Sequence, residues 1–90
     1  KDVTGWQMQV ATLVNRGAVV DAALAVERAT TALPPDVVHG LVGIIGPDRL
    51  TGPLLASSVP GKAGKTVRDV LSHSTHEGVR RLANPAVEEK

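Results

Sequence analysis

The chain has 90 residues, of which 42% are hydrophobic, yet it contains no Phe, Tyr or Cys and only one Trp. This length suits one domain, and a formal net charge of +1 argues against the strongly basic surface typical of nucleic-acid binders. The lack of Cys excludes disulfides, thiolate metal sites and Cys nucleophiles, and no apolar run approaches the roughly 20 residues that span a bilayer.

The composition also bears on stability and source. Aromatic side chains normally dominate core energetics, so a core without them depends on many small aliphatic contributions. We therefore expect a domain that is marginally stable alone and is stabilised by a partner or a second copy. The absence of Cys and of a signal peptide favours a cytoplasmic location, and the Val, Ala, Arg, Gly and Pro content suggests a GC-rich bacterial source. Because the chain begins at Lys1 rather than Met, we expect a fragment, a processed product or the ordered part of a longer protein.

Apolar residues at helical spacing predict two helices in the first third of the chain. The first covers residues 4–14 and ends before Gly17, which is free to adopt the left-handed conformation. The second covers residues 18–33, is rich in Ala, and stops at Pro34-Pro35.

A third helix is predicted from Pro35 to the Gly46-Pro47 stop, with Pro near its first position and an acid in its first turn. Gly40 and Gly43 are costly inside a helix, but they become useful where another backbone must come close. The alternative is that they only loosen the end of the helix. If they serve packing, this helix is the seam of the core or of a subunit interface.

The pattern after residue 47 is less regular. Single turns are predicted at residues 48–50 and 54–58, and a Pro/Gly loop at 59–65. Thr66 then caps a short helix that ends near His73, and Asp69 assists it as in a capping box.

A last helix is predicted to start at Ser74, which with Glu77 has the spacing of a capping box, and to end near Asn84-Pro85. The sequence therefore predicts an all-α fold, a compact bundle of four to six short helices without a sheet that ends in an αα-hairpin. Residues 1–85 would form a single helical domain, and residues 86–90 a solvated tail.

Residues 59–66 (VPGKAGKT) partly match a phosphate-binding P-loop, because Gly64-Lys65-Thr66 leads into a helix. Val59 occupies the place of the first glycine, no convincing strand precedes the segment, and the chain has no room for a parallel sheet. We interpret it as a flexible loop that leads into a capped helix.

Two His and an acid lie within five residues at His73, His76 and Glu77. A capping signal at Ser74 places a turn between the two imidazoles, so they would not share one helical face as metal ligands do. No Ser has the surroundings of a nucleophile elbow. We therefore predict no metal site, no cofactor and no enzymatic activity.

The prediction for function is a non-enzymatic protein–protein interaction or oligomerisation module, a structural or accessory part of a larger bacterial assembly. Its partner would be another protein or a second copy, and a pocket for a small apolar ligand is a further option. Trp is the residue type most enriched in interface hot spots, so Trp6 is the predicted central anchor. The predicted contact residues are Trp6, Val19, Val26, Val37, Leu41, Ile44 and Ile45.

The alternative function is a small DNA-binding regulator, because residues 66–83 have the length of a helix-turn-helix. The predicted DNA contacts are Lys65, Arg68, His76, Arg80 and Arg81. Gly78 inside the recognition helix and Glu77 at its start count against this alternative.

Overall fold

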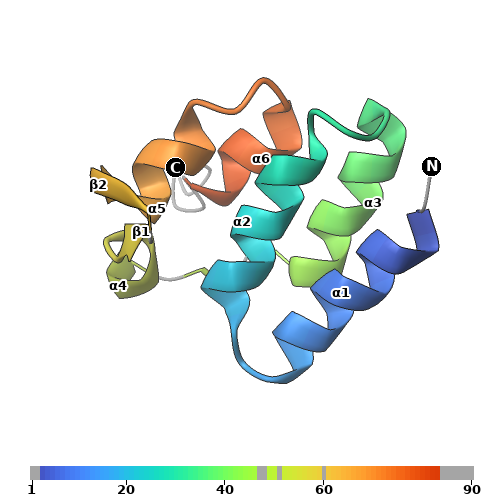
Figure 1. Ribbon diagram of the computed structural model, residues 1–90, viewed down its shortest axis with the longest axis horizontal. Coiled ribbons are helices and arrows are strands. Elements are labelled where there is room, and N and C mark those ends of the chain that lie inside the picture. Colours follow the sequence, from blue (N-terminus) through green and yellow to red (C-terminus); the bar gives the residue numbers. More distant parts are fainter. Residues whose placement is uncertain (1–2, 47–48, 51, 60, 84–90) are drawn as a thin grey trace, which may run out of the picture.

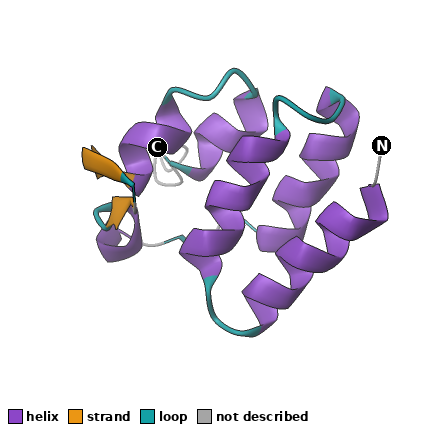
Figure 2. Cartoon of the chain, in the orientation of Figure 1, coloured by secondary structure: helices purple, strands orange, loops and turns teal. Residues whose placement is uncertain are grey.

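The computed structural model describes residues 3–46, 49–50, 52–59 and 61–83. These residues form a mostly helical, compact fold with a small sheet (Figures 1 and 2). The elements in chain order are α1 (Val3–Asn15), α2 (Val19–Ala29), α3 (Pro35–Ile45), α4 (Gly52–Leu55), β1 (Ser58–Val59), β2 (Lys62–Thr66), α5 (Val67–Ser72) and α6 (Glu77–Leu82). The radius of gyration, 12.1 Å, equals the about 12 Å expected for a folded chain of this length.

The three longest helices pack against one another, and α2 also borders the C-terminal helices (Figure 1). It contacts α1 and α3 as well as α5 and α6. Its Ala-rich sequence explains this position, because Ala22, Ala23, Ala25 and Ala29 are fully buried and let neighbouring helices approach closely. The centre of the fold is therefore built around a helix of small side chains.

The core is aliphatic and forms one cluster of Val, Leu, Ile and Ala side chains. Its largest fully buried members come from α1, α2 and α3 and from the C-terminal segments. They are Leu41, Ile45, Leu50, Leu55, Leu71, Leu82, Val10, Val26, Val38, Val67 and Val79. The aromatic Trp6 packs against this cluster but is only half-buried.

The predictions for α1 and α3 are confirmed. The backbone after α1 reverses at Gly17, whose φ is +83°, and Ala18 N–H donates to the carbonyl of Leu13 at 2.8 Å. Helix α3 begins with Pro35 in its first turn and ends at Gly46, whose φ is also +83°.

The predicted end of the second helix is wrong, because α2 stops at Ala29 rather than near Leu33. Two hydroxyl groups explain the early stop: Thr30 Oγ1 donates to Glu27 O at 2.7 Å, and Thr31 Oγ1 donates to Arg28 O at 3.0 Å. Such local hydrogen bonds compete with continuation of the helix. Leu33 remains buried after the turn. Its helical spacing from the apolar residues of α2 therefore reflects a buried position and not a continuation of the helix.

The prediction of a fold without a sheet is also wrong. The strands β1 and β2 form an antiparallel hairpin in which Ser58 pairs with Thr66 and Val59 with Lys62. Gly61 and Gly64 have φ of +83° and +79°, which glycine adopts without strain. The segment lacks the β-branched alternation that marks most strands, so glycine conformation rather than side-chain pattern makes the hairpin.

Helix α5 is confirmed with its capping box: Asp69 N–H donates to Thr66 Oγ1 at 3.2 Å, and Thr66 N–H donates to Asp69 Oδ2 at 3.1 Å. The N-cap predicted for the last helix is wrong. Helix α6 starts at Glu77 with His76 as its N-cap, while Ser74 Oγ accepts from His76 N–H at 3.1 Å and belongs to the preceding turn.

Helices α5 and α6 contact each other, but each has six residues, and their antiparallel arrangement as an αα-hairpin stays a prediction. The predicted turn at residues 48–50 falls partly outside the described residues. The predicted helix end at Asn84-Pro85 and the tail at 86–90 lie outside them altogether. Among the described residues, no helix has both the length and the hydropathy that crossing a membrane requires.

Candidate functional site

The seven residues predicted to make intermolecular contacts divide into two groups. Val26, Leu41 and Ile45 have no exposed surface, and Val19 is 8% exposed, so the folded chain uses these four side chains in its own core. Trp6, Val37 and Ile44 are half-buried and keep some exposed apolar surface. Periodicity could not separate the groups, because a core face and an interface face have the same spacing.

The exposed sides of α1 and α3 carry almost no charge. Helix α1 has the sequence VTGWQMQVATLVN and helix α3 the sequence PDVVHGLVGII, so all ten Lys and Arg residues lie outside them. Asp36 is the one carboxylate on the two helices. Met8 of α1 is 64% exposed, which is unusual for a large apolar side chain.

The exposed residues of α1 and α3 that lie beside each other can be inferred from what covers the other sides of the two helices. On α1, Gln9 and Leu13 line a cavity against α2 and β2, so Met8 and Ala11 lie on the other side of this helix, the one nearer α3. On α3, Val42 approaches α6, so the side with Val37, Gly40 and Ile44 lies toward α1. We call the residues along this shared side the α1–α3 surface: Thr4, Met8, Ala11, Asn15, Val37, Gly40 and Ile44.

Trp6 does not belong to the α1–α3 surface. It lies three residues before Gln9 and seven before Leu13, on the side of α1 that faces the cavity against α2. This cavity has a volume of about 380 Å³, with an apolar part from Leu13, Leu24, Val59 and Val70. Charged residues of both signs surround it, namely Asp21, Glu27, Arg28 and Lys62.

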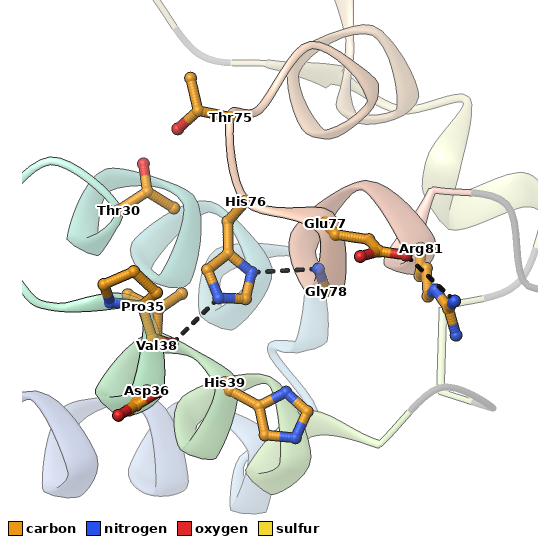
Figure 3. A pocket seen from close by; sticks show the side chains of 10 residues that line it. All are labelled: Thr30, Pro35, Asp36, Val38, His39, Thr75, His76, Glu77, Gly78 and Arg81. Carbon is orange, nitrogen blue, oxygen red and sulfur yellow. Dashed lines mark hydrogen bonds and ion pairs between the residues drawn. The ribbon is translucent and has the colours of Figure 1, made fainter.

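A larger cavity of about 520 Å³ lies where the end of α2, the start of α3 and the start of α6 meet (Figure 3). Its centre is His76, whose ring points from the start of α6 toward Pro35 and Val38. His76 Nδ1 accepts from Gly78 N–H at 3.0 Å, and His76 Nε2 lies 3.0 Å from the carbonyl oxygen of Pro35. The other lining residues are Thr30, Asp36, His39, Thr75, Glu77 and Arg81.

These two contacts define which ring nitrogen of His76 donates a hydrogen bond and which accepts one. A nitrogen that accepts from an N–H carries no proton, and a nitrogen that faces a carbonyl must donate. In these contacts Nε2 is the donor and Nδ1 the acceptor, and the ring ties α6 to the first turn of α3. Both ring nitrogens are occupied, so His76 has a structural role in this cavity.

The ring of His76 leaves little room for a side chain at position 78. A Cβ at this position would lie 3.0 Å from His76 Cε1 and 3.2 Å from His76 Nδ1. Glycine is unfavourable inside a helix, and from the sequence alone Gly78 counts against a recognition helix for this reason. The structure explains its presence, because a larger residue would displace the His76 ring that caps α6.

Three of the five residues predicted for DNA binding make contacts within the chain. His76 is held by its two hydrogen bonds, Arg80 Nη1 donates to Ser74 O at 2.9 Å, and Arg81 pairs with Glu77 at 3.1 Å. The last pair is exposed and contributes little to stability. Lys65 and Arg68 are exposed on β2 and α5.

The segment compared with a P-loop has a different conformation. Lys62, Gly64 and Lys65 belong to the exposed strand β2. The amide of Thr66 donates to Asp69, so an internal carboxylate takes the place that a phosphate would occupy. This hydrogen bond is the main reason that the pKa of Asp69 lies below its usual value, and the charge of Lys65 lowers the pKa further.

Among the described residues, no group of three or more His, Asp or Glu side chains is placed to hold a metal ion. The sequence prediction missed Met8, although a signal was present: helix α1 has thirteen residues without a charge, and an exposed helical face normally carries several. A scan of protein-family models found no match to the chain, and searches of curated proteins and of solved structures found none either.

Proposed function

We propose that this chain is a non-enzymatic protein-interaction or oligomerisation module that makes its contact through the α1–α3 surface. Such a module would be a structural or accessory part of a larger assembly, and we expect it in the bacterial cytoplasm. The proposal keeps Val37 and Ile44 from the predicted contact residues and adds Met8. It gives up Trp6, which lies on the other side of α1, and the four residues that lie in the core.

The observation that carries this proposal is the distribution of charge. Helices α1 and α3 contain 13 and 11 residues with Asp36 as their one carboxylate and no Lys or Arg. Protein interfaces are depleted in Lys, Glu and Asp and enriched in Met at their centres. An ordinary solvated helix face carries charged residues, so this pair of helices has the composition of a surface that another protein covers.

The exposed apolar atoms support the same assignment. Met8 is 64% exposed, and Val37 and Ile44 retain exposed surface beside Gly40. Covering them would remove apolar area from water at about 25 cal/mol per Å². For a small core without buried aromatic residues, this contribution is a considerable addition to stability.

A single added charge tests the proposal. The variant Met8→Lys places an ammonium group on the α1–α3 surface, and Ala63→Lys places one on the exposed strand β2 as a matched control. Tagged wild type and both variants would be compared for the proteins they retain, including untagged copies of the chain. We expect Met8→Lys to lose the retained protein and Ala63→Lys to keep it; equal retention by all three proteins would refute the proposal.

The DNA-binding alternative has less support, because His76 and Arg80 donate hydrogen bonds within the chain and Arg81 is paired with Glu77. It makes a distinct prediction. Duplex binding at about 50 mM salt should weaken steeply as salt rises, and the double variant Arg80→Ala, Arg81→Ala should reduce it. The Met8→Lys variant should bind DNA at least as well as wild type under this alternative, so the two functions separate experimentally.

A further inference from the structure

We infer that the protein covering the α1–α3 surface is a second copy of this chain, bound about a two-fold axis so that Met8 of each copy packs over Gly40 of the other. This inference rests on the proposed function and names its partner. It is based on two features of the α1–α3 surface. The surface has both an exposed Met side chain and an exposed glycine over which such a side chain can pack, and its seven residues are uncharged.

The protrusion and the flat place occur on neighbouring helices. Met8 extends into solvent from α1, whereas Gly40 and Gly43 on α3 are exposed and have no side chain. A Cβ built on either glycine meets nothing within 4 Å, so no described part of the chain fills the space directly above them. The flexible, unbranched Met side chain adapts well to such a space.

In a dimer with a two-fold axis, the Met8 side chain and the space above Gly40 would each take part in two equivalent contacts. In a contact of this symmetry, if residue i of one copy touches residue j of the other, then j of the first copy touches i of the second. Met8 would thus reach Gly40 in both directions from a single arrangement. A different partner would need its own matching protrusion and recess, whereas a second copy already has them.

The charge distribution favours this symmetry. Residues near a two-fold axis face their own copies, so any ionised group there would meet a like charge. The seven residues of the α1–α3 surface carry no ionised side chain, and the one carboxylate nearby, Asp36, lies on the same side of α3 one turn before Gly40. Elsewhere α2, β2, α5 and α6 all carry charged residues.

The extent of the surface predicts a weak dimer. Helices of 13 and 11 residues are about 20 and 16 Å long and lie about 10 Å apart, which gives a face of roughly 20 by 20 Å. A standard stable interface buries about 800 Å² on each partner. The face, about 400 Å² on each copy, is about half of this, so association should be weak and depend on concentration.

Sedimentation from about 1 µM to about 1 mM tests the inference. We expect wild type to change from monomer to dimer over this range, Met8→Lys to weaken the dimer at least about tenfold, and Ala63→Lys to leave it unchanged. Gly40→Lys serves as a second variant in case Met8→Lys folds poorly, which circular dichroism at low concentration would reveal. A wild type that stays monomeric at 1 mM, or a dimer that neither variant weakens, would overturn the inference.

Cysteine pairing then locates the contact, because the chain has no Cys of its own. Oxidation of a mixture of Met8→Cys and Gly40→Cys chains should give the mixed disulfide, and a mixture of Met8→Cys and Ala63→Cys chains should not. Equal yields in both mixtures would overturn the arrangement. If the dimer is absent but Met8→Lys loses a different retained protein, the second-copy inference fails and the proposed function stands; if nothing is retained either, both fail.

Discussion

Replacing the glycines of α3 by Ala tests the structure, because the structure predicts at which positions the substitution stabilises the fold and at which it destabilises it. Gly40 and Gly43 are exposed in the helix, and a Cβ at either position meets nothing within 4 Å. Neither has a positive φ. Gly inside a helix costs about 0.5–1 kcal/mol relative to Ala, because it loses more backbone freedom on folding.

We therefore expect Gly40→Ala and Gly43→Ala to stabilise the monomer. Gly40 lies in the middle of α3 and should give close to 1 kcal/mol, while Gly43 lies in the last turn and should give less. For a domain of this size, 1 kcal/mol corresponds to a rise in Tm of about 4–8 °C. Thermal unfolding by circular dichroism at about 1 µM chain, where association does not contribute, would measure both.

Two other glycines are controls with the opposite sign. Gly46 also has open space around its Cβ, but its φ is +83°, so Gly46→Ala should cost about 1–3 kcal/mol through backbone strain. Gly78→Ala should destabilise through its contact with His76. If Gly40→Ala lowers the Tm of the monomer, or Gly46→Ala raises it, the described geometry of α3 is wrong.

Three further predictions concern the core, the His76 contacts and the capping box. Leu41→Ala removes a fully buried side chain and should cost about 2–5 kcal/mol, much of the about 5–13 kcal/mol available to 90 residues, so urea unfolding should show a large loss. His76→Ala should cost about 2 kcal/mol by losing both the cap and the contact with Pro35, and His76→Asn should recover about half, since Asn caps α6 but is too short to reach Pro35; equal losses in urea unfolding would contradict the two roles. The pKa of Asp69 is lowered in the folded state, so its stabilising effect is full above the unfolded value of about 3.9 and disappears as pH falls through the lower folded value. The midpoint of unfolding should therefore fall more steeply below about pH 4 in wild type than in Asp69→Asn, and parallel curves would contradict the assignment.

Features set by neighbouring residues were predictable from sequence. The helices α1 and α3, the glycine and proline stops, and the capping box of Thr66 and Asp69 all depend on contacts within one or two turns. Capping by His76 was not predictable, because Ser74 and Glu77 have the standard capping spacing. The ring of His76 takes over because it also reaches Pro35, 41 residues away in the chain.

For the α1–α3 surface too, some features were predictable from the sequence and others depended on the tertiary structure. The sequence determined that α1 and α3 are helices almost free of charge, because composition and spacing are properties of the chain itself. Only the tertiary structure decided which apolar residues are available to a partner: Leu41 and Ile45 are fully buried in the core, whereas Val37 and Ile44 keep exposed surface. The physical reason is that burial depends on which helix faces are covered by neighbours, and this depends on residues far apart along the chain.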